Sequence, residues 1–97
     1  MLALAKGLIG GNLGIIAAAR KLHTFTDGVE PEIGALLNIF AGIASETDAL
    51  PIGDERSLWN AEALVQEDGK IATAERHWRE DGMGAAMRLV RLLEQAS

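Results

Sequence analysis

The sequence contains no cysteine and no tyrosine, and it has few aromatic residues, which are Phe25, Phe40, Trp59 and Trp78. The absence of cysteine excludes a disulfide framework, a thiolate metal site and a cysteine nucleophile. A chain of 97 residues that folds without such cross-links suits a reducing compartment, so we expect a cytoplasmic protein. This length corresponds to a single domain, residues 1–97, with a core of modest size.

The sequence also lacks the excess of basic residues that a nucleic-acid-binding surface requires. Nine Lys and Arg residues against 14 Asp and Glu residues give a net charge of −5, and we therefore expect no nucleic-acid partner. The acidic excess lies in residues 45–69, which hold seven acidic residues and one basic residue. The segments on either side are nearly neutral.

Long apolar runs of the kind that span a bilayer are absent from the sequence. Residues 1–19 are rich in Ala, Leu and Ile, but Lys6, Asn12 and four glycines interrupt them. No basic residue precedes this run, as one would in a signal peptide. The segment is also too short to cross a membrane. We therefore expect no contact with a membrane.

The residues that are abundant favour helices. Hydrophobic residues make up 48% of the chain, and Ala and Leu, which form helices well, are prominent among them. Strand-forming residues are scarce by comparison. The composition predicts an all-α fold, a small bundle of three to four helices.

Apolar residues recur at helical spacing in a first segment, residues 2–22, and in a second, residues 31–44. We expect the first segment to be one helix whose four glycines allow close packing, with a break near Gly10 and Gly11 as the alternative. The second begins at Pro31, a residue favoured at the first helical position. The apolar sectors of both segments exceed what a half-exposed helix needs, which predicts a homodimer.

A third helical segment begins after Asn60, a favourable N-cap residue. It reaches Gly82 and Gly84, where a break would give a fourth helix over residues 83–95. We expect the helix to continue, because no proline or polar loop separates the two halves.

The least regular part of the sequence lies between the second and third segments, at residues 45–60. Residues 51–53 fit a type I turn. Residues 45–53, Ser-Glu-Thr-Asp-Ala-Leu-Pro-Ile-Gly, resemble the loop of a group of short bacterial proteins of unassigned function. The resemblance covers most of the chain and extends to Arg20, Leu22, Arg56 and Trp59. It implies the same helical architecture and no particular activity. Ala49 stands where that group often has a His, so the loop offers no imidazole for metal or proton chemistry.

This acidic loop contains the candidate site residues. They are Glu46, Asp48, Asp54, Glu55, Arg56 and Trp59, which we expect to bind a partner or ligand. One alternative is structural: Thr47 and Asp48 cap backbone groups while Glu46 or Asp48 pairs with Arg56. Another is that the carboxylates hold a divalent cation, although their spacing is not that of an EF-hand.

No catalytic, metal or cofactor motif is evident, and we expect no enzyme. His23 and His77 are far apart in sequence, and no nucleophile lies beside a base. Residues 10–14 lack the strand and the Lys-Ser or Lys-Thr pair of a phosphate loop. The sequence favours a small acidic protein-interaction module, such as an antagonist of a basic protein. The alternative is a small-ligand or divalent-metal-binding domain that uses residues 45–56.

Overall fold

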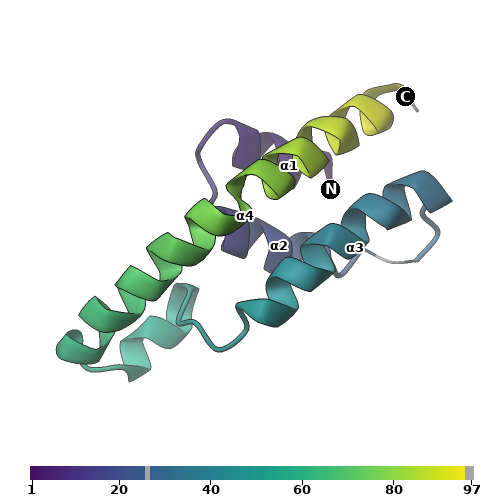
Figure 1. Ribbon diagram of the computed structural model, residues 1–97. Helices are drawn as coiled ribbons and strands as arrows, with labels where there is room; N and C mark the ends of the chain where they lie inside the picture. Colours follow the sequence, from purple (N-terminus) through teal and green to yellow (C-terminus); the bar gives the residue numbers. More distant parts are fainter. Residues whose placement is uncertain (26, 96–97) are drawn as a thin grey trace.

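The computed structural model describes residues 1–25 and 27–95. These residues form four α-helices and one 3-10 helix and no strand, so the all-α prediction is confirmed for them (Figure 1). The elements are α1 (Leu2–Ile9), α2 (Ile15–Leu22), α3 (Pro31–Glu46), η1 (Gly53–Leu58) and α4 (Ala61–Gln95). No helix within the described part of the chain is both long and apolar enough to span a membrane.

Residues 2–22 form two short helices, so the expectation of a single helix is wrong and the alternative break is the one observed. Gly11 has φ +80°, a left-handed conformation that glycine adopts without steric cost. The amides of Asn12 and Leu13 both donate to the carbonyl of Gly7, at 2.9 and 3.2 Å, and close the turn. Gly11 therefore allows the chain to turn at the end of α1.

α3 begins at Pro31 as predicted and ends at Glu46, two residues later than expected. α4 is a single helix of 35 residues, which confirms the predicted continuity through its glycines. The Oδ1 atom of Asn60 accepts a hydrogen bond from the amide of Ala63 at 2.7 Å, as an N-cap residue does. Gly82 is buried, and a Cβ there would lie 3.1 Å from Ile15, so close packing of α2 on α4 accounts for this glycine.

The type I turn predicted at residues 51–53 is wrong. Ile52 is extended, with φ −117° and ψ 128°, whereas the third residue of such a turn has ψ of about 0°. The amide of Ile52 instead donates to the Oε1 atom of Glu55 at 3.0 Å, and Gly53 with φ +84° begins η1. The side chain of Glu55, three residues further along the chain, therefore accepts the hydrogen bond from the Ile52 amide.

The core lies where α1, α2 and α3 pack against the second half of α4 (Figure 1). Its largest fully buried apolar side chains come from every α-helix and include Leu8, Ile16, Leu22, Phe40, Ile43 and Leu89. All the buried residues of α4 lie between Gly82 and Leu89. The hydrophobic core therefore occupies one part of an elongated molecule that measures 46 × 23 × 19 Å.

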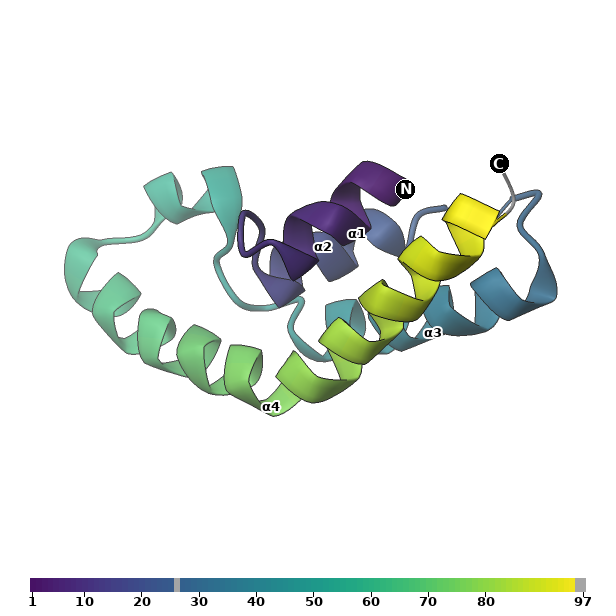
Figure 2. The same ribbon diagram turned by 90° about the horizontal axis from the view of Figure 1, so that it is seen from above.

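The first half of α4 extends away from this core together with η1. Figure 2 shows α4 bent near its middle, with η1 lying opposite its first turns at the far end of the molecule. Not one of residues 53–75 is buried. This segment, residues 53–75, is termed the arm.

Candidate functional site

Arg20, in the last turn of α2, holds the loop that leads from α3 into the arm. Its Nη2 atom donates to the carbonyl oxygens of Thr47 at 2.8 Å and Leu50 at 2.7 Å. Its Nη1 atom lies 2.7 Å from the Oε1 atom of Glu55. A guanidinium can make these contacts together because its five N–H groups spread in a fixed plane, whereas an ammonium group is a point charge. The path of the loop therefore depends on a residue in a distant helix.

Arg56 connects η1 to α4. Its Nη1 and Nη2 atoms donate to the two carboxylate oxygens of Asp68, at 2.7 and 3.2 Å, and Nη1 also donates to the carbonyl of Pro51 at 3.2 Å. The interpretation that Arg56 pairs with Glu46 or Asp48 is therefore wrong. α4 returns alongside η1 and places the carboxylate of Asp68 within hydrogen-bonding distance of Arg56.

Thr47 has the capping role that the structural alternative gave it. Its hydroxyl donates to the carbonyl of Ile43 at 2.6 Å, and its amide donates to the same carbonyl at 3.1 Å. The side chain therefore adds a second hydrogen bond to a carbonyl in the last turn of α3. Thr47 is thus a buried structural residue of the loop.

Two of the candidate site residues, Glu55 and Arg56, form ion pairs within the chain. The hydrogen bond from Arg20, and then the one from the amide of Ile52, lower the pKa of Glu55 below its ordinary value of 4.5. The hydrogen bond to Asp68 raises the pKa of Arg56, and the same contact lowers the pKa of Asp68 below 3.8. Glu55 and Arg56 therefore stay ionised at neutral pH and serve to position the arm.

The remaining acidic candidates are exposed. The carboxylates of Glu46, Asp48 and Asp54, and that of Glu62, form no ion pair with the part of the chain that is described. These carboxylates do not converge, and no group of three or more acidic or histidine side chains among the described residues could hold a metal ion. The structure thus offers four dispersed negative charges and no oxygen cage of the kind that Ca²⁺ prefers.

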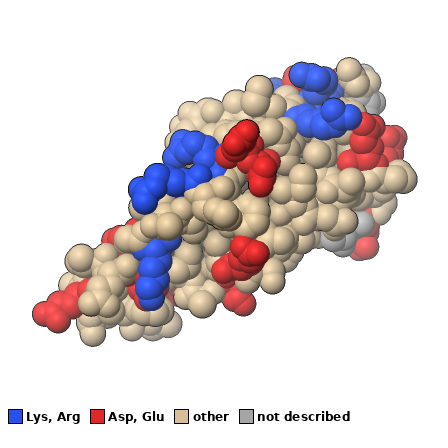
Figure 3. All heavy atoms as spheres, in the orientation of Figure 1, with Lys and Arg blue, Asp and Glu red and all other residues tan. Residues whose placement is uncertain are grey.

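Apolar side chains are exposed at the end of the arm. Leu58 is 86% exposed, Val65 is 73% exposed and Trp59 is 38% exposed. Asp54 and Glu62 lie within a few residues of them in η1 and in the first turn of α4. Figure 3 shows acidic side chains at this end of the molecule. These five residues are termed the arm tip.

Sequence reasoning identified Asp54 and Trp59 of the arm tip and missed Leu58, Glu62 and Val65. A usable signal was present for Val65, because it is an isolated apolar residue on the otherwise polar face of an amphipathic helix. Leu58 gave no such signal, because its exposure depends on the 3-10 helix that the loop forms.

A groove of about 680 Å³ lies beside the arm, between the end of α3 and the first half of α4. One wall consists of Glu46, Thr47, Ala49 and Leu50, and the other of Gln66, Gly69, Lys70, Thr73, Ala74, His77 and Trp78. Only Glu46 was a predicted site residue. The residues of the second wall come from α4, which returns past the loop, and sequence spacing alone does not indicate that arrangement.

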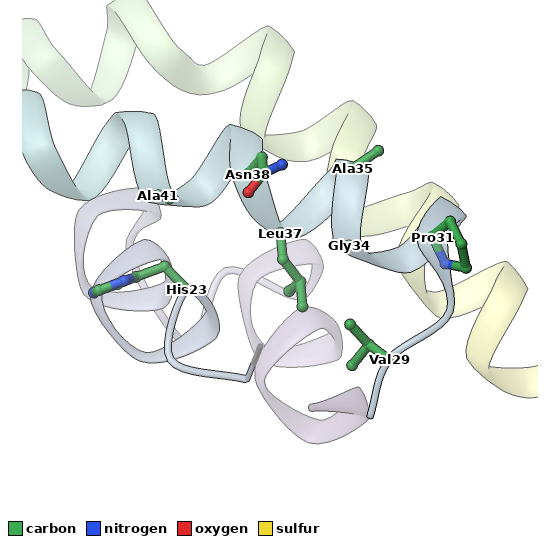
Figure 4. A pocket seen from close by; sticks show the side chains of 8 residues that line it. All are labelled: His23, Val29, Pro31, Gly34, Ala35, Leu37, Asn38 and Ala41. Carbon is green, nitrogen blue, oxygen red and sulfur yellow. The ribbon is translucent and has the colours of Figure 1, made fainter. Parts of the chain in front are cut away.

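A smaller hollow of about 360 Å³ lies along α3 on another part of the surface (Figure 4). Gly34, which has no side chain, and Ala35 and Ala41, whose side chains are short, line this space together with His23 and Val29. Among the described residues, His23 and Asn38 are the polar side chains that line the hollow and the rest of its lining is apolar, so it has few of the converging polar groups that are typical of ligand sites.

Comparisons with models of protein families, with curated proteins and with solved structures give no match for this chain. The resemblance to the group of short bacterial proteins therefore stays a prediction. Three of the residues on which it rests have clear structural roles: Arg20 and Arg56 position the loop and the arm, and Leu22 is fully buried. The arm tip and the groove are the features from which a function can be inferred.

Proposed function

We propose that this protein is a small helical interaction module that binds a basic protein partner through the arm tip. The observation that carries the proposal is the exposure of Leu58 and Val65, at 86% and 73%, on a segment that contributes nothing to the core. Exposed apolar side chains on a segment outside the core are typical of protein-binding surfaces. The Arg20–Glu55 ion pair joins the arm to α2, and the Arg56–Asp68 ion pair joins η1 to α4 within the arm, which keeps this surface in a defined position.

The charge around the arm supports a basic partner. Residues 45–69 contain seven acidic residues. Glu55, Glu67 and Asp68 are neutralised in ion pairs with Arg20, Lys70 and Arg56, which leaves four. A partner with Lys or Arg around an apolar patch would complement these charges and associate faster at low salt. The proposal assigns no reaction to the protein.

A homodimer is a separate proposal, and other surfaces support it. Ile9, Ile39 and Met87 lie outside the arm and are 40%, 38% and 56% exposed. Two arm tips placed against each other would bring like charges together, which is unfavourable. We therefore expect self-association to leave the arm tip accessible. Sedimentation equilibrium of the wild type and of Met87→Ser tests this proposal.

Quantitative capture from the host extract tests the interaction proposal. The bait proteins are the wild type, the double variant Leu58→Ser/Val65→Ser, and the matched control Met87→Ser, which also removes an exposed apolar side chain. We expect a basic protein to be retained by the wild type and the control and lost from the double variant. Retention should also fall as salt is raised from about 0.05 M to about 0.5 M, because exposed charges are then screened. Equal retention on all three baits would contradict the proposal.

A further inference from the structure

The groove and the arm tip use neighbouring residues of α4. Gln66, the first groove residue of α4, directly follows Val65 of the arm tip. We propose that the groove binds a second part of the same partner, a short apolar segment that carries a Lys or Arg residue. This inference rests on the proposed function and assigns a role to residues that lie outside the arm tip.

The length of the groove sets the size of the segment. It follows α4 from Gln66 to Trp78, and a rise of about 1.5 Å for each of the 12 residue steps corresponds to about 18 Å. An extended chain advances about 3.3 Å per residue, so about five residues span this distance. A peptide segment of the partner fits this dimension, whereas a single small molecule would occupy only part of it.

The lining of the groove favours apolar side chains. Leu50 and Ala74 contribute apolar surface, and Trp78 is held in place because it packs against the core. Gly69 has no side chain and leaves open space in the wall formed by α4. An apolar side chain of the partner can therefore contact a surface that is already fixed before binding, which limits the entropy lost on association.

The charges at the groove favour a cation in the same segment. Glu46 lines the wall formed by α3 and Asp48 follows two residues later, both with exposed carboxylates. The opposite wall has one lysine, Lys70, whose Nζ atom already lies 3.0 Å from Glu67. The charge that is not balanced within the groove is thus negative. A second copy of this chain would add the acidic arm to this site, which disfavours it as the occupant.

Photo-crosslinking in the host cell tests the inference. A photoreactive amino acid is placed at position 73 in the groove, at position 65 in the arm tip or at position 87 as a control on the second half of α4. We expect the same protein to crosslink from positions 73 and 65 and not from 87. The peptide attached to position 73, identified by mass spectrometry, should contain an apolar residue next to Lys or Arg.

The other outcomes separate the two proposals. Crosslinking from position 65 without position 73 would overturn the groove inference and leave the interaction proposal intact. Crosslinking from neither position would overturn both. A crosslink from position 73 to a second copy of this chain, or to a segment without a basic residue, would also overturn the groove inference.

A pair of glycine variants provides a second measurement. Gly69 and Gly84 both lie in α4, and a Cβ atom at either position would meet no neighbouring side chain or segment within 4 Å, so the two positions are equally open at the point where a side chain begins. Gly69→Phe fills the groove, and Gly84→Phe adds the same side chain outside it. With the purified crosslinked partner as the probe, we expect Gly69→Phe to weaken binding about tenfold and Gly84→Phe to change it less than about twofold. Equal effects of the two substitutions would overturn the inference.

Discussion

Replacing Gly14 with Ala should reveal a long-range helix cap between α2 and α4. The Oε2 atom of Glu75 in α4 accepts a hydrogen bond from the amide of Ile15, the first residue of α2, at 2.9 Å. A Cβ atom at position 14 would lie 2.5 Å from the Oε1 atom of the same carboxylate. Ala at position 14 therefore displaces the Glu75 carboxylate from the end of α2.

The magnitude follows from two opposing effects. Gly14 has φ −72° and ψ 161°, which Ala adopts without strain, so restriction of the unfolded chain should stabilise Gly14→Ala by about 0.4–1 kcal/mol. Loss of the cap should destabilise it by about 1 kcal/mol. The single substitution should therefore change stability little. Glu75→Ala alone should destabilise by about 1 kcal/mol, and Gly14→Ala added to it should then stabilise.

Urea unfolding of the wild type, the two single variants and the double variant gives the coupling free energy. We expect a value of about 1 kcal/mol, because the two substitutions remove the same hydrogen bond. Free energies that add to within about 0.3–0.5 kcal/mol would refute the reasoning, since the carboxylate would then not cap α2.

Three further predictions concern the core, the long helix and the loop. Phe40→Ala should destabilise the protein by about 3–5 kcal/mol in urea unfolding, because the ring is fully buried, and a loss below about 1 kcal/mol would contradict this placement. Gly84→Ala should stabilise by up to about 1 kcal/mol, since the position is exposed and open; a lower melting temperature would contradict this. Arg20 lowers the pKa of Glu55 below 4.5, so this contact stabilises the fold above that pH and is lost as the pH falls through the lowered value. Arg20→Ala should therefore make the melting temperature fall less steeply as the pH is lowered through the acid range. An unchanged dependence of the melting temperature on pH would argue against the contact.

Local signals made the helices that begin at Pro31 and after Asn60 predictable from the sequence. A proline at the first helical position and an Asn N-cap act on neighbouring backbone groups, so the sequence alone contains the information. The sequence did not decide whether the chain breaks between α1 and α2, because glycines occur both where helices pack closely and where the chain turns. Gly11 ends α1 while Gly82 serves packing, and composition does not distinguish these roles.

The candidate site was predictable only in part, for a physical reason. Contacts that position the loop join Arg20 to residues 27–35 positions away, and the cap on α2 joins residues 60 positions apart. Such pairs depend on how the helices pack, which periodicity does not specify. The acidic character of residues 45–69 was visible in the sequence, whereas the ion pairs that occupy Glu55 and Arg56 were not.

The most direct test of the interaction proposal is a charge reversal with a matched control. Asp54→Lys/Glu62→Lys in the arm tip and Glu80→Lys/Asp81→Lys elsewhere on α4 each raise the net charge by four, from −5 to −1. Circular dichroism confirms that both variants fold, and titration with the captured basic protein measures affinity at two salt concentrations. We predict that the arm-tip variant binds about tenfold more weakly or worse and with a smaller salt dependence, while the control stays within about twofold of the wild type. Equal weakening of both variants, or none in the arm-tip variant, would contradict the proposal that the arm tip is the binding surface.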